Sequence, residues 1–216
     1  MKDKTLIVMG NGPSLKDVDF DMLSGYDTFG LNAAYRAYPR LNWWPTYHGC
    51  FDYRVTDNHK ENFIDLINSK KFKKHFYIRN LSNEENFQFI NLQTFGSTNK
   101  TNNKPLDFNG NSGANACSVG VCLGYKKIIL LGVDCNYVEF VEGSKKDGPG
   151  GLVMEKTPGT NPNYWFDDYQ QKGDEYNIPD GLSFHMPTWN TFAYRAAHAN
   201  IEVVNCSPIT TLRSFK

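Results

Sequence analysis

The chain has 216 residues, of which 40% are hydrophobic and 21% charged, and its 23 basic and 23 acidic side chains leave a formal net charge of zero. This composition excludes a wholly disordered chain, and the balanced charge disfavours a broad nucleic-acid-binding surface. One core grows to roughly 250 residues before chains divide, so a single domain is expected over residues 1–216. No apolar run approaches the ~20 residues of a membrane span, and the run at residues 5–9 is too short for a secretion signal. We therefore expect a cytoplasmic protein without a transmembrane segment.

In chain order, the patterns predict a strand at residues 5–9, a helix at 15–23, strands at 26–31 and 46–51, a helix at 58–69, strands at 75–79 and 87–92, a helix at 112–123, a strand at 128–131, a helix at 187–200 and a strand at 202–205. The strands are short apolar runs, and the helices have helical periodicity or capping signals. Alternating strands and helices predict an α/β fold. The expected architecture is a single Rossmann-like, doubly wound, mostly parallel sheet.

Residues 135–184 form a long stretch rich in Gly, Pro, Asp, Asn and aromatic side chains. A loop of this length in a compact domain is usually functional. We therefore expect residues 135–184 to form a loop that acts as a lid over an active site.

The five cysteines are Cys50, Cys117, Cys122, Cys135 and Cys206. Their number is odd, no C-x-x-C pair occurs, and most lie in apolar segments. This pattern predicts reduced thiols in the core rather than disulfides or zinc ligands.

A glycine-containing turn follows the first predicted strand, with the residues Gly10, Asn11, Gly12, Pro13 and Ser14. In doubly wound sheets this loop faces the ligand crevice, and glycines let the backbone approach a phosphate. The turn lacks the third glycine of a dinucleotide fingerprint and the Gly-Lys-Ser/Thr of a Walker A loop. It is either a nucleotide site or an ordinary tight turn.

Two further signals lie at the edges of predicted elements. Ser112 and Gly113 begin a helix, where unsatisfied N–H groups suit an anion, although a plain N-cap is the alternative. Asp134 follows the strand at 128–131, where it is either a ligand contact or a cap.

The predicted lid carries tyrosines, adjacent acids and a terminal histidine. Tyr164 and Tyr169 can donate to a phosphate or sugar, and Asp167 and Asp168 resemble paired acids that hold Mg²⁺ or Mn²⁺. His185 ends the lid just before a helix, and imidazole can accept a proton near neutral pH. It is a candidate general base, with a structural histidine as the alternative.

Taken in order, these residues resemble the bacterial sialyltransferases of glycosyltransferase family 42. The resemblance lies in residues 7–15 with Asn32 after the second strand, in residues 112–134, and in His185 with the segment that ends at 205–208. Relatives of that family include pterin diphosphokinase-like enzymes with a related Gly-Asn-Gly-Pro-Ser start.

The resemblance implies an inverting transfer of a sialic-acid-like sugar acid from a CMP-activated donor to a glycan hydroxyl, with no cofactor or metal required. It makes His185 the base and the lid tyrosines Tyr164 and Tyr169 the donors to the departing phosphate. The residues implied to bind the nucleotide or donor are Gly10, Asn11, Gly12, Pro13, Ser14, Asn32, Ser112, Gly113, Asp134 and Tyr137. Tyr137 lies one position beyond the tyrosine of the family pattern, which is Asn136 here. A homo-oligomer is also implied.

Two alternatives stay open at this point. One is a diphosphokinase-like enzyme that uses ATP and Mg²⁺ (or Mn²⁺), with Asp134, Asp167 and Asp168 as metal ligands. The other is a non-catalytic nucleotide- or carbohydrate-binding module that has kept the cleft.

Overall fold

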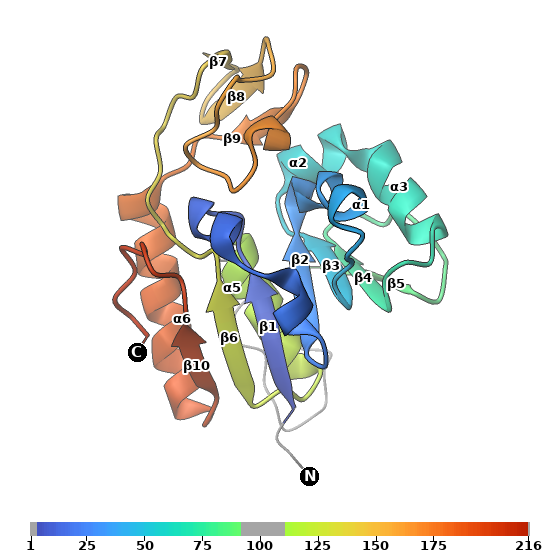
Figure 1. Ribbon diagram of the computed structural model, residues 1–216, viewed down its shortest axis with the longest axis vertical. Coiled ribbons are helices and arrows are strands. Elements are labelled where there is room, and N and C mark those ends of the chain that lie inside the picture. Colours follow the sequence, from blue (N-terminus) through green and yellow to red (C-terminus); the bar gives the residue numbers. More distant parts are fainter. Residues whose placement is uncertain (1–3, 92–110, 216) are drawn as a thin grey trace.

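The computed structural model describes residues 4–91 and 111–215, and a seven-stranded sheet lies at its centre. The strand order is β10-β6-β1-β2-β3-β4-β5, and every neighbouring pair is parallel (Figure 1). The strands are β1 (Thr5–Met9), β2 (Asp27–Leu31), β3 (Tyr47–Cys50), β4 (Lys74–Tyr77), β5 (Phe87–Phe89), β6 (Lys127–Leu131) and β10 (Glu202–Asn205). The predicted α/β fold with a mostly parallel sheet is confirmed.

The central strand β1 is apolar on both faces, and both faces are covered. Leu6 and Val8 of β1 pack in the core shared with α5 and α6, whereas Ile7 and Met9 pack against the segment that follows β1. Such two-sided burial is typical of parallel sheets and makes their strands visible as continuous apolar runs. The helices are α1 (Tyr38–Leu41), α2 (Tyr53–Asn58), α3 (Lys60–Asn68), α5 (Ser112–Cys122) and α6 (Met186–His198).

The strand order reverses once, between β1 and β6. From β1 the chain adds β2 to β5 on one side, and β6 and β10 later extend the sheet on the other side. A crevice opens at the carboxyl ends of the strands at such a switch point, which makes it the expected ligand site of an open α/β sheet.

The segment at residues 135–184 is more ordered than the predicted loop. It contains a second, antiparallel sheet of β7 (Ser144–Lys146), β8 (Gly151–Met154) and β9 (Glu175–Asn177). Figure 1 shows this small sheet beyond the carboxyl ends of β1 and β6. Its own core includes Leu152 and Tyr176. The segment predicted as a long loop therefore contains three short strands that the sequence patterns did not indicate.

Two predicted helices differ in the structure: one is divided, and the other is preceded by an additional helix. The helix expected at 15–23 is a pair of 3₁₀ turns, Pro13–Asp17 and Phe20–Leu23, because the Asp19 carboxylate accepts a hydrogen bond from the Asp21 N–H and begins a new turn. The helix expected at 58–69 is α3, and α2 precedes it where no helix was predicted. Residues 92–110, which include the end of the strand expected at 87–92, lie outside the described residues.

No disulfide joins the five cysteines, all of which lie in the described residues, and most of them are buried. Cys50, Cys117 and Cys135 are buried, Cys122 is half-buried and Cys206 is exposed. Within residues 4–91 and 111–215, none of the helices has the length and apolar character needed to cross a membrane.

Candidate active site

A cleft of about 570 Å³ opens at the carboxyl ends of β1, β2 and β6, and β9 of the lid forms part of its wall. Most of the predicted site residues line it together. They are Gly10, Asn11, Gly12, Asn32, Ser112, Gly113, Tyr137, Tyr164, Tyr169 and His185. Residues from six separate stretches of the sequence therefore meet at one cavity, as the switch-point geometry predicts.

The turn after β1 is fastened to the turn after β6. The N–H of Gly10 donates to the Leu131 carbonyl at 2.7 Å, and the N–H of Gly12 donates to the Gly132 carbonyl at 2.8 Å. A Cβ at Gly10 would collide with the Gly132 carbonyl, and a Cβ at Gly12 would collide with the Asp134 carboxylate. Both glycines are thus required for the close approach of two turns, and they bring the backbone to the cleft edge.

Pro13, Ser14 and Asp134 do not line the cleft. Instead, the buried Asp134 carboxylate accepts two hydrogen bonds from Ser14, from its N–H at 2.9 Å and from its hydroxyl at 2.5 Å. The bond to the Ser14 N–H satisfies one backbone donor at the start of the first 3₁₀ turn, as a capping side chain would. Asp134 and Ser14 therefore hold the shape of the site from behind, a correction to their expected contact with the donor.

Three asparagine side chains at the cleft have buried polar atoms without a hydrogen-bond partner among the described residues. These atoms are Oδ1 of Asn11, Oδ1 of Asn32 and Nδ2 of Asn111. A buried polar atom that lacks a partner costs about 1–3 kcal/mol, so such atoms are rare and call for an explanation. A polar ligand in the cleft would supply the missing partners.

The start of α5 combines a cap with close helix packing. Oδ1 of Asn111 accepts from the Ala114 N–H at 2.9 Å, so the N-cap alternative describes this residue. A Cβ at Gly113 would come within 2.7 Å of the Trp189 ring of α6. The glycine therefore lets α6 approach, while Ser112 remains at the cleft surface.

Tyr169 has its hydroxyl oxygen held by two donors. Nδ2 of Asn11 donates to it at 3.0 Å and the Ala33 N–H at 3.3 Å, and the Tyr164 ring stacks on the Tyr169 ring at 3.8 Å. Burial raises the pKa of Tyr169 well above its ordinary value, so the hydroxyl is neutral. Since the oxygen already accepts two bonds, its own proton is available for an acceptor in the cleft.

His185 ends a π-helical turn, Gly181–His185, that leads directly into α6. Its ring lies 5.0 Å from the ring of Tyr137, and both residues line the cleft. Burial lowers the pKa of His185, and Asp180 opposes this only in part. The imidazole is therefore neutral at pH 7 and can accept a proton from a group in the cleft.

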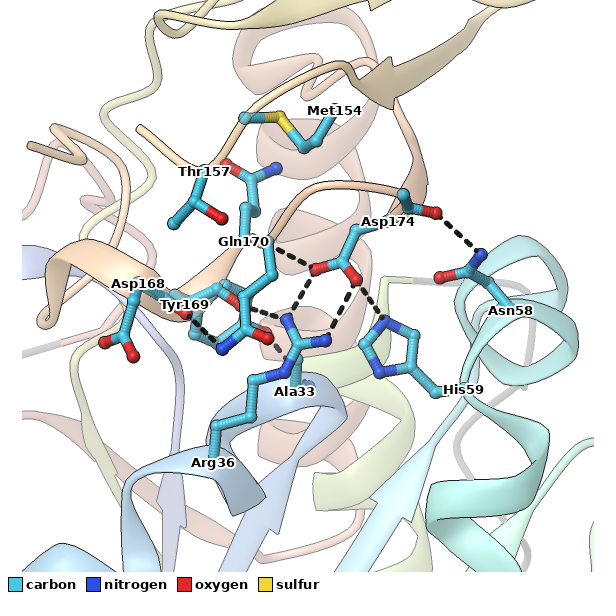
Figure 2. Close-up of polar contacts among 12 residues, drawn as sticks. Ala33, Arg36, Asn58, His59, Met154, Thr157, Asp168, Tyr169, Gln170 and Asp174 are labelled. Carbon is cyan, nitrogen blue, oxygen red and sulfur yellow. Dashed lines mark hydrogen bonds and ion pairs between the residues drawn. The ribbon is translucent and has the colours of Figure 1, made fainter. Parts of the chain in front are cut away.

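A buried ion pair that the sequence patterns did not reveal fixes the lid to the main sheet. Arg36 donates to both oxygens of Asp174, at 2.5 and 2.9 Å, and also to the Tyr169 carbonyl at 2.7 Å (Figure 2). Nε2 of His59 lies 3.6 Å from the same carboxylate, and the hydroxyl of Tyr35 bonds Nδ1 of His59 at 3.0 Å. Arg36 and Asp174 are 138 residues apart, so no local sequence pattern predicts their pairing.

The acids that a metal-dependent alternative would use have separate partners. Asp168 pairs with Arg40 at 2.9 Å, whereas Asp167 accepts from the Asn161 N–H at 3.2 Å. The Asp134 carboxylate is hydrogen-bonded by Ser14. In the part of the chain that the structure describes, no group of three or more His, Cys, Asp or Glu side chains is arranged to hold a metal ion.

The fold and the cleft together define a doubly wound α/β protein with a polar cleft at its switch point. No protein-family model and no curated protein sequence matches the chain. Solved structures do match it, and several of them are structures of a sialyltransferase.

The sialyltransferase CstII from Campylobacter jejuni in complex with the substrate analogue CMP-3FNeuAc is 19% identical over 98% of this chain and 84% of that chain, with a TM-score of 0.55. A structure of sialyltransferase CST-II with a trisaccharide acceptor and CMP gives 19% identity, the same coverage of both chains and a TM-score of 0.54. The resemblance to family 42 sialyltransferases is thereby confirmed at the level of the fold.

Proposed function

We propose that this protein is a glycosyltransferase that transfers a sialic-acid-like sugar acid from a CMP-activated donor to a glycan hydroxyl. The observation that carries the proposal is the set of unpartnered amide atoms of Asn11, Asn32 and Asn111 in one cleft with a neutral His185. Three of the matched sialyltransferase structures are complexes with CMP, and one of these contains a trisaccharide acceptor as well. The same fold with a polar, ligand-seeking cleft is consistent with the same kind of donor.

The proposed reaction is a single displacement with inversion. The acceptor hydroxyl oxygen forms a bond to the anomeric carbon as the bond from that carbon to the CMP phosphate oxygen breaks. The hydroxyl proton passes to the neutral imidazole of His185, and CMP leaves with the bonding electrons. Negative charge then develops on the phosphate, where the Tyr169 hydroxyl can donate. The reaction as proposed requires no metal ion.

Ligand-induced stabilisation tests the donor nucleotide directly. A ligand that binds only the folded state stabilises it by RT ln(1 + [L]/Kd). Thermal unfolding would be followed with CMP, CDP, UDP, GDP and ATP, each with and without Mg²⁺. We expect a selective rise in Tm with CMP that persists in EDTA. A rise only with ATP and Mg²⁺ would overturn the proposal in favour of a diphosphokinase-like enzyme.

A pair of asparagine variants locates the bound nucleotide. Asn32 and Asn42 both have left-handed backbone, with φ of 54° and 48°, but only Asn32 lines the cleft. Asn32→Ala is expected to remove most of the CMP-induced rise in Tm, while Asn42→Ala keeps it. Equal responses in the two variants would place the nucleotide elsewhere. CMP-linked sugar acids are then tested for transfer, and binding without transfer or donor hydrolysis would leave only a non-catalytic module.

A further inference from the structure

A chain of hydrogen bonds runs through the sheet interior behind Asn32. His48 on β3 and His75 on β4 are register partners, and both are fully buried. Nε2 of His48 lies 3.0 Å from the Asn32 carbonyl oxygen, and Nδ1 of His48 lies 2.8 Å from the hydroxyl of Tyr77. Nδ1 of His75 lies 3.1 Å from the same hydroxyl. None of these three side chains lines the cleft, so the proposed reaction leaves them unexplained.

The chemistry of the four groups decides which atom donates in each of these hydrogen bonds. A carbonyl oxygen only accepts, so Nε2 of His48 must carry a proton. Burial keeps the His48 ring neutral, which leaves Nδ1 bare to accept the proton of the Tyr77 hydroxyl. Tyr77 has then used its one proton, so Nδ1–H of His75 must be the donor to Tyr77. The bare atom that results, Nε2 of His75, is the nitrogen that has no partner in the described structure.

We infer that His48 is a positioning residue for the nucleotide site. Its Nε2–H holds the carbonyl of Asn32, a residue with a left-handed backbone (φ 54°) at the end of β2. Asparagine tolerates this conformation better than most residues, but the conformation still needs support. The bond fixes the peptide plane of Asn32 and thereby keeps its amide at the cleft. This inference rests on the proposed function only in taking Asn32 as a contact of the nucleotide.

The tautomers of the two histidines give a test that needs no ligand. Nitrogen-15 spectra of the imidazoles at pH 7 are expected to show His48 as the neutral Nε2–H tautomer and His75 as the neutral Nδ1–H tautomer. A His48 ring that is protonated on Nδ1, whether neutral or charged, would overturn the inference. The measurement uses the unchanged protein, so it does not depend on a variant that folds.

Matched substitutions of His48 and His75 test the effect of the hydrogen bond from His48 to the Asn32 carbonyl. An asparagine side chain retains a polar group near the Nδ1 position but has nothing at Nε2, whereas glutamine places an amide nitrogen near Nε2. His48→Asn is therefore expected to weaken CMP binding by about three- to tenfold, and His48→Gln is expected to restore it to within about twofold. His75→Asn disturbs the same layer of the sheet without touching Asn32, and its CMP affinity should equal that of the wild type.

Equal CMP affinity in His48→Asn and His75→Asn would overturn the inference, and so would a failure of His48→Gln to bind better than His48→Asn. If the unchanged protein binds no CMP, the proposed function fails but the inference is still tested. In that case the carbon-13 chemical shift of the Asn32 carbonyl should differ from the wild-type value in His48→Asn and equal the wild-type value in His75→Asn. The same shift in both variants would show that His48 does not anchor Asn32.

Discussion

Nδ2 of Asn11 donates a hydrogen bond to the hydroxyl of Tyr169 at 3.0 Å, across 158 residues of sequence. The bond joins the turn after β1 to the lid, and it uses the tyrosine oxygen as an acceptor so that the hydroxyl proton is free. One amide thus orients a residue of the lid toward the cleft. Several consequences can be measured.

Tyr169→Phe should lower kcat by about a hundredfold with a modest change in CMP affinity. The substitution removes a preorganised donor to the departing phosphate and leaves Nδ2 of Asn11 with one bond fewer. Steady-state transfer kinetics provide the measurement. Tyr194→Phe is the control, since that tyrosine is exposed on α6 and does not line the cleft. An unchanged kcat in Tyr169→Phe would exclude its role as a donor.

His185→Ala should reduce transfer by about 10²- to 10⁴-fold, because a positioned base contributes that much, while CMP affinity stays within about twofold. His198→Ala, on the exposed end of α6, is the matched control. In the unchanged protein kcat/KM should rise with pH on its acid side, with a midpoint below the ordinary histidine pKa of about 6.5, because burial lowers the pKa of His185. Full transfer by His185→Ala would assign the base to another group.

Asp174→Asn should destabilise the protein by about 3 kcal/mol, because it leaves the guanidinium of Arg36 largely buried without its charge partner. The Arg36–Asp174 side chains are only 14% and 11% exposed, whereas those of Arg40–Asp168 are 52% and 43% exposed. Asp168→Asn should therefore cost less than about 1 kcal/mol. Urea unfolding measures both values, and similar losses would show that the buried pair does not hold the lid.

Acid should destabilise the fold through its buried histidines. Burial lowers the pKa of His48 to about 3 and those of His59 and His75 to about 4, against an unfolded value of about 6.5. Between these values the unfolded chain binds protons that the folded chain does not, so the free energy of unfolding falls as pH falls from about 6.5 toward 4. Each histidine contributes at most about 1.4 kcal/mol per pH unit.

Urea unfolding from pH 7 to pH 5 measures this dependence, and His75→Gln should make it less steep. An identical slope in the variant would mean that His75 is already protonated in the folded state, or that it keeps its ordinary pKa there.

The main sheet was predictable because its central strands carry their own signal. β1 is buried on both faces and β6 is buried on one face and half-buried on the other, so Ile7, Val8, Ile129 and Leu130 belong to uninterrupted apolar runs. The lid sheet carries no such signal. β7 is Ser-Lys-Lys with two exposed lysines, and its partner strands are short, so the pairing depends on contacts made only in the folded chain.

The site was predictable where a residue follows a strand and obscure where a residue acts through a distant partner. Gly10, Asn11 and Asn32 reach the cleft because the carboxyl ends of parallel strands meet there. Asp134 occupies such a position too, but its carboxylate is used by Ser14. The hydrogen bonds of His48 depend on which groups the neighbouring strands place beside it, and hydrophobic periodicity does not predict these neighbours.

The single reversal of strand order also determines when each strand can pair during synthesis of the chain. β1 has β2 on one side within its first contacts, but its other neighbour is β6, with Ile7 aligned to Ile129. During synthesis from the N-terminus, one edge of β1 therefore stays unpaired until more than half of the protein has emerged. The outer edge of β6 then stays unpaired until β10 is made. Pairing between strands that are distant in sequence is slow, and the unpaired edges promote aggregation. Recombinant production should accordingly gain from lower temperature, at which the hydrophobic association of exposed segments is weaker.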